Sequence, residues 1–284
     1  MNKINQTVLM SGVRYFSVEE LNPYSDRLVQ PDIKLAEKEF LTIKTALEES
    51  GVTVIQVDSP ESCQDGIYTA NWALCRNGKA ILSSLPSMRA GEEIHAREAL
   101  ESEGFEVIPA PYKFSGQGDA LPCGNLLFAG QTYRTDQRIH QFIADKLGYE
   151  VISLETVPEL GGNGTPVINK VTGWPDSFFY DIDLAISVLS SELIAWCPEA
   201  FTPESQAKIR ELAIERIEVS YQEATQGFAC NLISTGKTVI MSKSAPELQA
   251  TIESHGFKVI TPEITELAKG GGYIRCTTLT LDNN

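Results

Sequence analysis

Four segments of the sequence share one pattern: Leu47-Glu-Glu-Ser-Gly51-Val-Thr-Val-Ile55, Leu100-Glu-Ser-Glu-Gly104-Phe-Glu-Val-Ile108, Lys146-Leu-Gly148-Tyr-Glu-Val-Ile152 and Ile252-Glu-Ser-His-Gly256-Phe-Lys-Val-Ile260. In each segment a helical stretch leads to a glycine, and a short run rich in β-formers follows. Glycine takes the left-handed conformation that ends a helix, and β-branched residues favour strands. The pattern therefore predicts four junctions at which a helix passes into a strand.

The spacing of the four glycines indicates a fifth unit. Gly51 and Gly104 are 53 residues apart, Gly104 and Gly148 are 44 apart, and Gly148 and Gly256 are 108 apart. The last interval is about twice the others, and Leu212-Ala-Ile-Glu-Arg-Ile-Glu-Val219 inside it reads as a helix end and a strand without the glycine. We therefore expect five units of about 55 residues.

Each unit is expected to contain one helix and short strands. In the first helix, Ile33, Ala36, Phe40, Ile43 and Leu47 recur at spacings of three and four and form one apolar face. Helices are predicted over 32–50, 90–103, 135–147, 203–214 and 245–255. Strands are predicted over 52–57, 80–84, 105–109, 126–130, 150–154, 184–189, 192–196, 229–234, 238–242 and 257–261.

Five α/β units can stack as a solenoid or close into a ring, and a ring leaves a central pocket. No linker rich in Pro, Gly or Ser divides the chain, so we expect residues 1–284 to form a single domain. The least regular stretch, 158–176, reads as a long loop inserted within a unit, and loops of this length are commonly lids or binding loops.

Composition excludes several classes of protein. Of 284 residues, 42% are hydrophobic and 21% are charged, which is typical of a globular chain. No apolar run approaches the ~20 residues that span a bilayer, and the first ten residues do not resemble a signal peptide. The formal charge of −15 repels phosphate backbones and anionic lipid, which argues against nucleic-acid and membrane partners. We expect a cytoplasmic protein.

The six cysteines lie far apart in the sequence, and none forms a Cys-x-x-Cys pair. With three histidines in the chain, the sequence predicts no metal site, and most of the thiols are expected to be reduced and buried. The glycines at 116–118 and 161–164 lack the spacing of nucleotide-binding loops and read as turns.

The C-terminal segment Gly270-Gly-Gly-Tyr-Ile-Arg275-Cys276 differs from these turns. Three consecutive glycines let the backbone approach a ligand closely. Arg275 beside Cys276 could favour the thiolate, which is the reactive form of cysteine. The alternative is a buried cysteine that opens a C-terminal strand.

From Val8 to Leu281 the sequence resembles the guanidino-group-modifying (pentein) superfamily, especially its dimethylarginine dimethylaminohydrolase and arginine dihydrolase branch, which is related to the amidinotransferases. The blocks that carry the resemblance are Asn22-Pro23, Asp65-Gly-Ile-Tyr-Thr-Ala-Asn71, Arg89-Ala-Gly-Glu92-Glu93, Phe114-Ser-Gly-Gln-Gly-Asp119-Ala-Leu121, Gly130-Gln-Thr-Tyr-Arg134-Thr-Asp136, Tyr180-Asp-Ile-Asp183-Leu-Ala, Ala229-Cys-Asn231 and Gly271-Gly-Tyr-Ile-Arg-Cys276.

The resemblance implies a five-bladed α/β propeller of pseudo-fivefold symmetry with a central pocket. It also implies that a cysteine thiolate attacks the central carbon of a guanidinium and forms a covalent thioether, which water or an amine then resolves. Cys276 matches the nucleophile. Asp65 and Asn71 match positions that grip the guanidinium, and Arg134 and Arg89 match arginines that hold the α-carboxylate of the substrate.

Two blocks depart from the family pattern. The general acid/base histidine of the family is replaced by Asp181, and the glutamate that pairs with that histidine is replaced by Ser115. We take Asp181 as the provisional acid/base. If the segment is a strand, Asp181 and Asp183 share one face; the alternative is an edge strand with two solvated aspartates.

These observations predict a hydrolase or transferase that acts on a C–N bond of an arginine-like guanidino or amidino substrate, with Cys276 and Asp181 as catalytic residues and no metal or organic cofactor. A homo-oligomer is compatible with the sequence. The alternative is a catalytically silent member of the superfamily that binds a small ligand or a protein partner.

Overall fold

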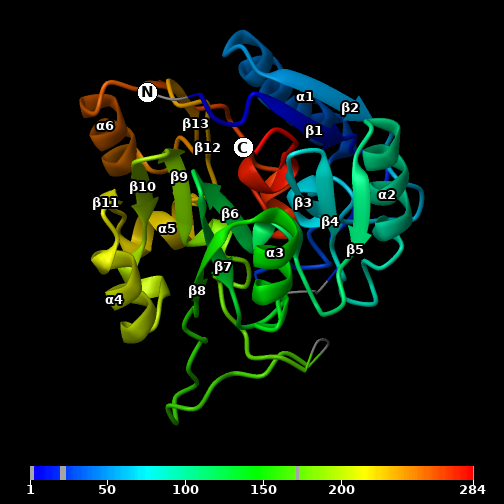
Figure 1. The fold of residues 1–284 in the computed structure, drawn as a ribbon. Helices are drawn as coiled ribbons and strands as arrows, with labels where there is room; N and C mark the ends of the chain where they lie inside the picture. Colours follow the sequence, from blue (N-terminus) through cyan, green and yellow to red (C-terminus); the bar gives the residue numbers. More distant parts are fainter. Residues whose placement is uncertain (1–2, 20–23, 171–172, 284) are drawn as a thin grey trace.

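The computed structural model describes residues 3–19, 24–170 and 173–283, and within them the strands form five small sheets of three strands each (Figure 1). The pair Asn22-Pro23 lies outside the described residues. The strands are β1 (Thr7–Ser11), β2 (Thr53–Val57), β3 (Ala73–Arg76), β4 (Lys79–Leu82), β5 (Glu106–Pro109), β6 (Ala120–Cys123), β7 (Leu126–Gly130), β8 (Glu150–Leu154), β9 (Ile186–Ser190), β10 (Leu193–Trp196), β11 (Glu215–Glu218), β12 (Ile233–Ser234), β13 (Thr238–Ile240), β14 (Lys258–Ile260) and β15 (Leu279–Thr280).

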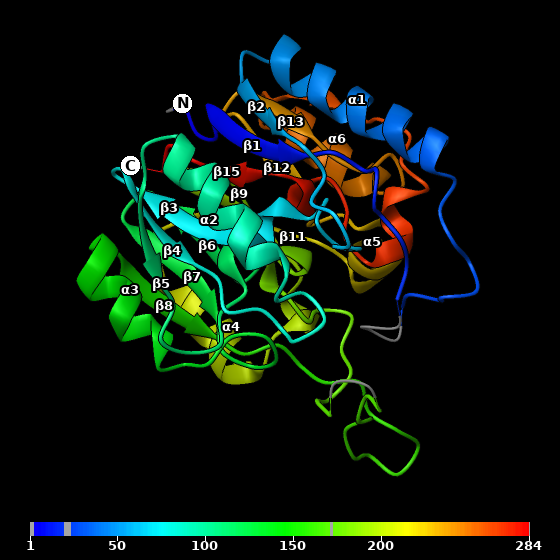
Figure 2. The same cartoon turned by 90° about the vertical axis from the view of Figure 1, so that its right-hand side faces the viewer.

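The five sheets repeat one topology. In each, the middle strand pairs antiparallel with one neighbour and parallel with the other, as β4 does with β3 and β5. The orders are β15-β1-β2, β3-β4-β5, β6-β7-β8, β9-β10-β11 and β12-β13-β14. The first sheet combines both ends of the chain, because Val8 and Leu9 of β1 pair with Thr280 and Leu279 of β15 (Figure 2).

One helix connects the two parallel strands of every sheet, as a parallel pair requires a crossover. The helices are α1 (Ile33–Glu49), α2 (Glu92–Ser102), α3 (Ile139–Leu147), α4 (Pro203–Glu211), α5 (Tyr221–Gly227) and α6 (Pro246–Ser254), of which α5 follows β11 and is no such connection. Figure 1 shows α1, α2, α4 and α6 at the periphery of the molecule, outside the strands.

The predicted helix-to-strand junctions are confirmed. Gly51, Gly104, Gly148 and Gly256 all have positive φ, between 73° and 85°, directly after their helices. The unit without a glycine is also present: α4 ends at Glu211, and β11 follows. The five helices predicted from the sequence correspond to α1, α2, α3, α4 and α6.

Other expectations are corrected. The sequence did not predict strands β1, β3, β6 and β15 or helix α5. The strand expected over 229–234 is reduced to β12, because residues 228–232 form a turn. In this turn Asn231 N–H donates to Phe228 O and Leu232 N–H donates to Cys230 O. The segment Tyr180–Asp183 is no strand either. Ile182–Leu184 is a 3₁₀ turn (η3), so alternation along a strand does not place its two aspartates.

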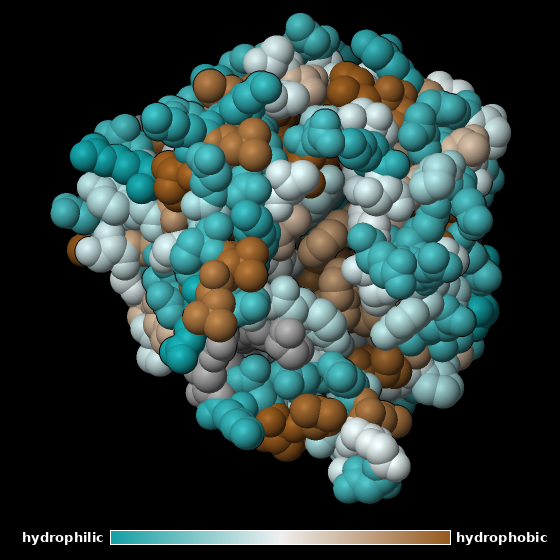
Figure 3. Space-filling model, turned by 180° about the vertical axis from the view of Figure 1, so that it is seen from behind, coloured by the Kyte–Doolittle hydropathy of each residue, from teal (hydrophilic) through white to brown (hydrophobic). Residues whose placement is uncertain are grey.

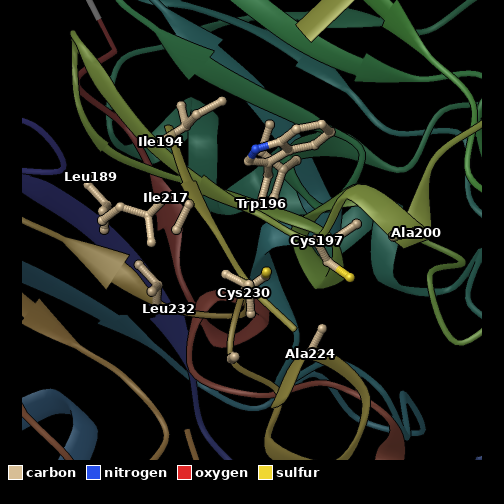
Figure 4. Close-up of a cluster of buried hydrophobic side chains, with 14 of the residues drawn as sticks. Leu189, Ile194, Trp196, Cys197, Ala200, Ile217, Ala224, Cys230 and Leu232 are labelled. Atoms are coloured by element: carbon tan, nitrogen blue, oxygen red, sulfur yellow. The ribbon is translucent and has the colours of Figure 1, made fainter. Parts of the chain in front are cut away.

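Neighbouring sheets contact one another in order. β15 contacts β3, β6 contacts β9, and β9 contacts β12. Apolar clusters join the second sheet to the third and the fifth to the first. The largest cluster surrounds β9 and β10; Figure 4 shows Trp196, Cys197 and Cys230 within it, and all six cysteines of the chain are buried with free thiols.

The described parts of the segment 158–176, residues 158–170 and 173–176, project from the body of the molecule in both ribbon views (Figures 1 and 2). Seen from behind Figure 1, the surface is hollowed near its middle, with apolar side chains in the wall of the hollow (Figure 3). Within the described residues, no helix is long and apolar enough to cross a membrane.

Glu39 on the buried face of α1 fixes the segment that leads to Cys276. Its carboxylate accepts bonds from the backbone N–H groups of Thr265, Glu266 and Leu267 at 2.7–3.0 Å. A buried carboxylate that receives several N–H donors satisfies groups that would otherwise have no partner. Glu39 therefore joins α1 to the C-terminal segment.

We expect Glu39→Ala to lower the free energy of unfolding by about 2–4 kcal/mol, because it leaves buried N–H donors unpaired. Urea denaturation followed by circular dichroism measures the change. The exposed Glu37 on the same helix provides the control, and Glu37→Ala should shift stability by less than ~0.5 kcal/mol. Equal effects in the two variants would contradict the anchoring role of Glu39.

Candidate active site

Four short 3₁₀ turns meet in the structure. They come shortly before β3, β6, β9 and β15, which are inner strands, that is, strands that pair antiparallel with the middle strand of their sheet. They are η1 (Thr69–Trp72), η2 (Gly116–Gly118), η3 and η6 (Arg275–Thr277), and η1 contacts both η2 and η6 while η2 contacts η3. Each comes from a different part of the chain. The turns bring Asn71, Asp181 and Cys276 together although they are about 100 residues apart in sequence.

These turns enclose a narrow cavity with about 280 Å³ of space between its atoms. All six residues predicted for the site lie on its wall, and all are buried. The wall consists of Asp65, Tyr68, Asn71, Arg89, Arg134, Tyr180, Asp181, Gly270, Gly272 and Cys276. The structure thus brings the predicted nucleophile, acid/base and binding residues to one place.

Two polar side chains contact the thiol of Cys276. Its Sγ lies 3.1 Å from Oδ2 of Asp183, to which the thiol donates, and Nδ2 of Asn231 donates to Sγ at 3.2 Å. Oδ1 of Asn231 also accepts the backbone N–H of Cys276 at 3.2 Å. Burial and the charge of Asp183 raise the pKa of this thiol well above its usual range. Both effects favour the protonated thiol over the thiolate.

Arg275 does not point toward the thiol, contrary to the sequence-based suggestion. Its guanidinium donates to the carbonyl of Thr278 at 2.7 Å and to Oε1 of Gln117 at 2.8 Å. Gln117 in turn donates to the carbonyl of Thr280. Arg275 therefore connects η6, η2 and β15.

Asp181 is held on one side only. Its Oδ2 accepts bonds from Nδ2 of Asn71 at 2.9 Å and from Arg134 at 3.2 Å, while its buried Oδ1 has no partner among the described residues. The alternative of two solvated aspartates is wrong, since Asp181 is 1% exposed and Asp183 is fully buried. Oδ1 of Asp183 also lacks a partner in the described structure.

The carboxyl groups of the site affect one another. Burial and the charge of Asp181 raise the pKa of Asp183 to about 8, and the same two causes raise the pKa of Asp119 to about 7. Asp119 lies behind the cavity, where its Oδ1 accepts the backbone N–H of Ile182 at 3.0 Å and so fixes η3. Like charges enclosed together cannot all ionise, so protons are retained here near neutral pH.

Arg89 is paired with protein groups along both edges of its guanidinium. Glu92 accepts its Nε and one terminal nitrogen, each at 2.7 Å, and the other terminal nitrogen donates to Oδ1 of Asn71 at 2.8 Å. Nε lies 3.8 Å from Oδ2 of Asp65. Burial raises the pKa of Asp65 to about 6, with Arg89 acting in the opposite direction.

Arg134 pairs with Asp181 and lies over the ring of Tyr180, 4.2 Å from its centre. The Tyr180 hydroxyl donates to the carbonyl of Gly271. A side chain at Gly272 would approach the ring of Tyr68 to 2.6 Å and Cβ of Cys276 to 2.9 Å. Glycine at this position therefore lets the aromatic wall pack directly against the cysteine.

The sequence did not predict that Asp183 and Asn231 contact the thiol, although both residues lie in blocks that carry the family resemblance. It also missed Glu92, which lies in the block that begins at Arg89. No histidine lies on the cavity wall: His140 contacts the carbonyl of Gly130, and His255 contacts Glu215. Among the described residues, no cluster of His, Cys, Asp or Glu could hold a metal ion.

Comparison with known proteins agrees with this arrangement. A family model described as "N,N dimethylarginine dimethylhydrolase, eukaryotic" matches residues 25–282. The chain belongs to this family. The predicted resemblance is therefore confirmed at the level of the family.

Two relatives are similar over nearly the whole chain. The N(G),N(G)-dimethylarginine dimethylaminohydrolase of Mycobacterium tuberculosis is 29% identical over 272 residues, which cover 95% of this chain and 84% of the relative. The bifunctional arginine dihydrolase/ornithine cyclodeaminase ArgZ of Synechocystis is 28% identical over 282 residues, 96% of this chain but 37% of the relative. The chain thus spans about a third of the bifunctional protein.

Solved structures are also similar. The N-terminal domain of ArgZ, in a cysteine-to-serine variant bound to substrate, superposes with a TM-score of 0.86 and 27% identity over 98% of this chain and 99% of that chain. A second structure of that domain, covalently bound to a reaction intermediate, has a TM-score of 0.85 over 97% of this chain. These relatives are guanidino-group hydrolases, which supports the enzyme interpretation.

The raised pKa of Asp183 predicts a pH dependence of stability. An aspartate in the unfolded chain has a pKa near 3.9, and the folded value is about 8, so the native state binds the proton more tightly. The resulting stability is present below pH 4 and is lost as the pH rises through 8. We expect the melting temperature of the wild type to fall between pH 5 and pH 9, and that of Asp183→Asn to fall less.

Asp136 provides the control for this measurement. Its hydrogen bonds with Arg138 lower its pKa to about 2, so Asp136→Asn should leave the slope between pH 5 and pH 9 unchanged. Parallel melting curves for the wild type and Asp183→Asn would show that Asp183 does not titrate in this range.

Proposed function

We propose that this chain is a hydrolase or transferase that cleaves a C–N bond of a guanidino or amidino substrate through a covalent thioether on Cys276. The family of the chain and the position of Cys276 on the wall of a buried polar cavity support the proposal. Its substrate is a small molecule, and no cofactor takes part. We also propose a cytoplasmic location.

The observation that carries the proposal is a pair of buried acceptors without partners near the thiol. Oδ1 of Asp181 and Oδ1 of Asp183 have no hydrogen-bond donor among the described residues. Such atoms are costly unless a ligand supplies donors, and a guanidinium presents several coplanar N–H groups. Asp65 and the second lone pair of Oδ1 of Asn71 add acceptors on the cavity wall, where Asp181 also lies.

Asp183, in its ionised form, is the proposed first proton acceptor. The thiol of Cys276 transfers its proton to Asp183 as the sulfur attacks the central carbon of the guanidinium, and the C–S bond forms. A bound guanidinium also lowers the pKa of the thiol, because its positive charge favours the thiolate. The nucleophile is therefore activated by the substrate.

Asp181 is proposed to relay the proton that Asp183 took from the thiol to the departing nitrogen. The C–N bond breaks, the amine leaves, and an amidino-thioether remains on Cys276. Water or a second amine then adds to the same carbon and loses a proton to a site carboxylate, and the C–S bond breaks. The products of hydrolysis are an amine and a ureido compound, and the thiol is regenerated.

Arg89 and Arg134 hold these groups in place. Arg89 fixes Asn71 through Oδ1, and Arg134 fixes Asp181 through Oδ2. Binding of a substrate carboxylate by these two arginines, as predicted from the resemblance, stays a prediction. We further propose that the five sheets are the blades of a single-domain propeller of pseudo-fivefold symmetry.

The absence of histidine from the cavity wall favours a second candidate, a protein that binds a guanidinium without turning it over. General acid–base assistance contributes about 10²–10⁴ in rate, and its loss would leave binding intact. Isothermal calorimetry that shows binding, together with no product after prolonged incubation, would establish this alternative.

The test of the proposed function is capture of the intermediate. The protein is incubated with arginine, methylated arginines, agmatine and guanidino acids, quenched in acid and analysed by peptide mass spectrometry. We expect an adduct on the peptide that contains Cys276, with release of amine and ureido product. Cys276→Ser should abolish both, and Cys123→Ser, a change at a buried cysteine of β6, should abolish neither. Absence of any adduct and product would contradict the proposal.

We expect Asp181→Asn to lower turnover on the substrate so found by at least about a hundredfold, the low end of general acid–base effects. Covalent labelling of Cys276 by iodoacetamide should survive this change, because the thiol keeps its contacts with Asp183 and Asn231. Full activity of Asp181→Asn would exclude the acid/base role. The double change Asp181→His with Ser115→Glu should give measurable hydrolysis of an arginine-type guanidine, and initial-rate assays of both variants provide the comparison.

A further inference from the structure

Both arginines on the cavity wall already have carboxylate partners. Glu92 pairs with Arg89 through two bonds of 2.7 Å, and Asp181 pairs with Arg134 at 3.2 Å. All four side chains are at least nine-tenths buried. A substrate carboxylate would therefore meet two guanidinium groups whose charge is already compensated.

The charges around the cavity leave no positive surplus. No lysine lies on the wall. Among the described residues, carboxyl groups on the wall or directly behind it outnumber guanidinium groups; they are Asp65, Glu92, Asp119, Asp181 and Asp183, against Arg89, Arg134 and Arg275. Even with protons retained on Asp119 and Asp183, the other three carboxyl groups compensate the three guanidinium groups, so no positive charge is left over for an added anion.

The cavity is also narrow. The rings of Tyr68 and Tyr180 form part of its wall. Aromatic faces attract cations and offer no donor to a carboxylate other than a hydroxyl. The hydroxyls of Tyr68 and Tyr180 already donate to the carbonyls of Leu267 and Gly271.

We propose, on the basis of the proposed function, that the substrate is a small guanidinium or amidinium cation without a carboxylate group. Asp181 already pairs with Arg134 and so takes the place that a substrate carboxylate would need. The residue that replaces the family histidine thus selects the substrate as well as serving the reaction.

The test compares ligands that differ by one carboxylate. Arginine is paired with agmatine, and 4-guanidinobutanoate is paired with propylguanidine. Binding is measured by calorimetry on Cys276→Ser, which prevents turnover. We expect the member without the carboxylate to bind at least about tenfold more tightly in each pair. The kcat/KM of the wild type for the same pairs is a second measure that needs no variant.

Asp181→Asn, added to Cys276→Ser, should reduce this preference by at least about tenfold, because Arg134 is then free to bind a carboxylate. Asp119→Asn is the matched control: it makes the same chemical change at a neighbouring buried carboxyl group, but Asp119 bonds to Ile182 rather than to Arg134. An equal reduction in the two variants would overturn the assignment to the Asp181–Arg134 pair.

The outcomes separate the two proposals. Preference for agmatine and propylguanidine supports the inference. Equal or tighter binding of arginine and 4-guanidinobutanoate overturns it and leaves the proposed function standing. If no member of either pair binds or is turned over, both proposals fail.

Discussion

The antiparallel pairing of β15 with β1 is the contact on which the site depends. It joins the two ends of the chain in the first sheet, and Cys276 lies three residues before β15. Two further bonds fix this arrangement: the Thr69 hydroxyl contacts the carbonyls of Leu9 and Thr277, each at 3.0 Å. The N-terminal strand, η1 and η6 are therefore held together at one threonine. Without this closure the nucleophile would have no fixed position relative to Asp65 and Asn71.

The polar groups that this closure gathers are costly to bury. Asp119, Asp181 and Asp183 lie within one buried cluster, and the pKa values of Asp119 and Asp183 are raised by burial and by the charge of Asp181. A fold selected for stability alone would place apolar groups there. The surrounding apolar clusters offset this cost, and the retained carboxyl groups are what a guanidinium requires. The carboxyl groups that destabilise the fold are thus the same groups that the proposed reaction uses.

The sequence predicts the connecting helices and most middle and outer strands of the five sheets, but it misses the inner strands β3, β6 and β15. Glycine after a helix and an alternating or β-branched strand are local signals, so the outer strands, the middle strands other than β1 and the connecting helices are found from the local sequence. Gly51, Gly104, Gly148 and Gly256 mark four of the junctions between helix and outer strand. The inner strands β3, β6 and β15 are two to four residues long and buried on nearly every position, so they lack alternation. These residues form strands because of the strands with which they pair, and not because of a pattern in their own sequence.

The same distinction applies to the site. Family blocks predict Cys276, Asp65, Asn71, Arg89, Arg134 and Asp181, and all six reach the cavity wall. The contacts between them could not be predicted, because they depend on turns that meet only in the folded chain. Asp183 was read as a neighbour of Asp181 on a strand, whereas the 3₁₀ turn places it against the thiol. Arg275 was read as a partner of the thiol, whereas it bonds to Gln117 and Thr278.

The two departures from the family pattern fit each other physically. Nδ2 of Asn71 donates to Ser115 and to Asp181, and a side chain at Gly118 would lie 2.3 Å from that nitrogen, so the space is filled. A glutamate at 115 would add a further carboxylate close to Asp181, with repulsion that no nearby cation is free to compensate. A serine accepts the same bond from Asn71 without charge. Once an aspartate stands at 181, the neutral residue at 115 follows from electrostatics, and the pair of changes is one alteration of the site rather than two separate losses.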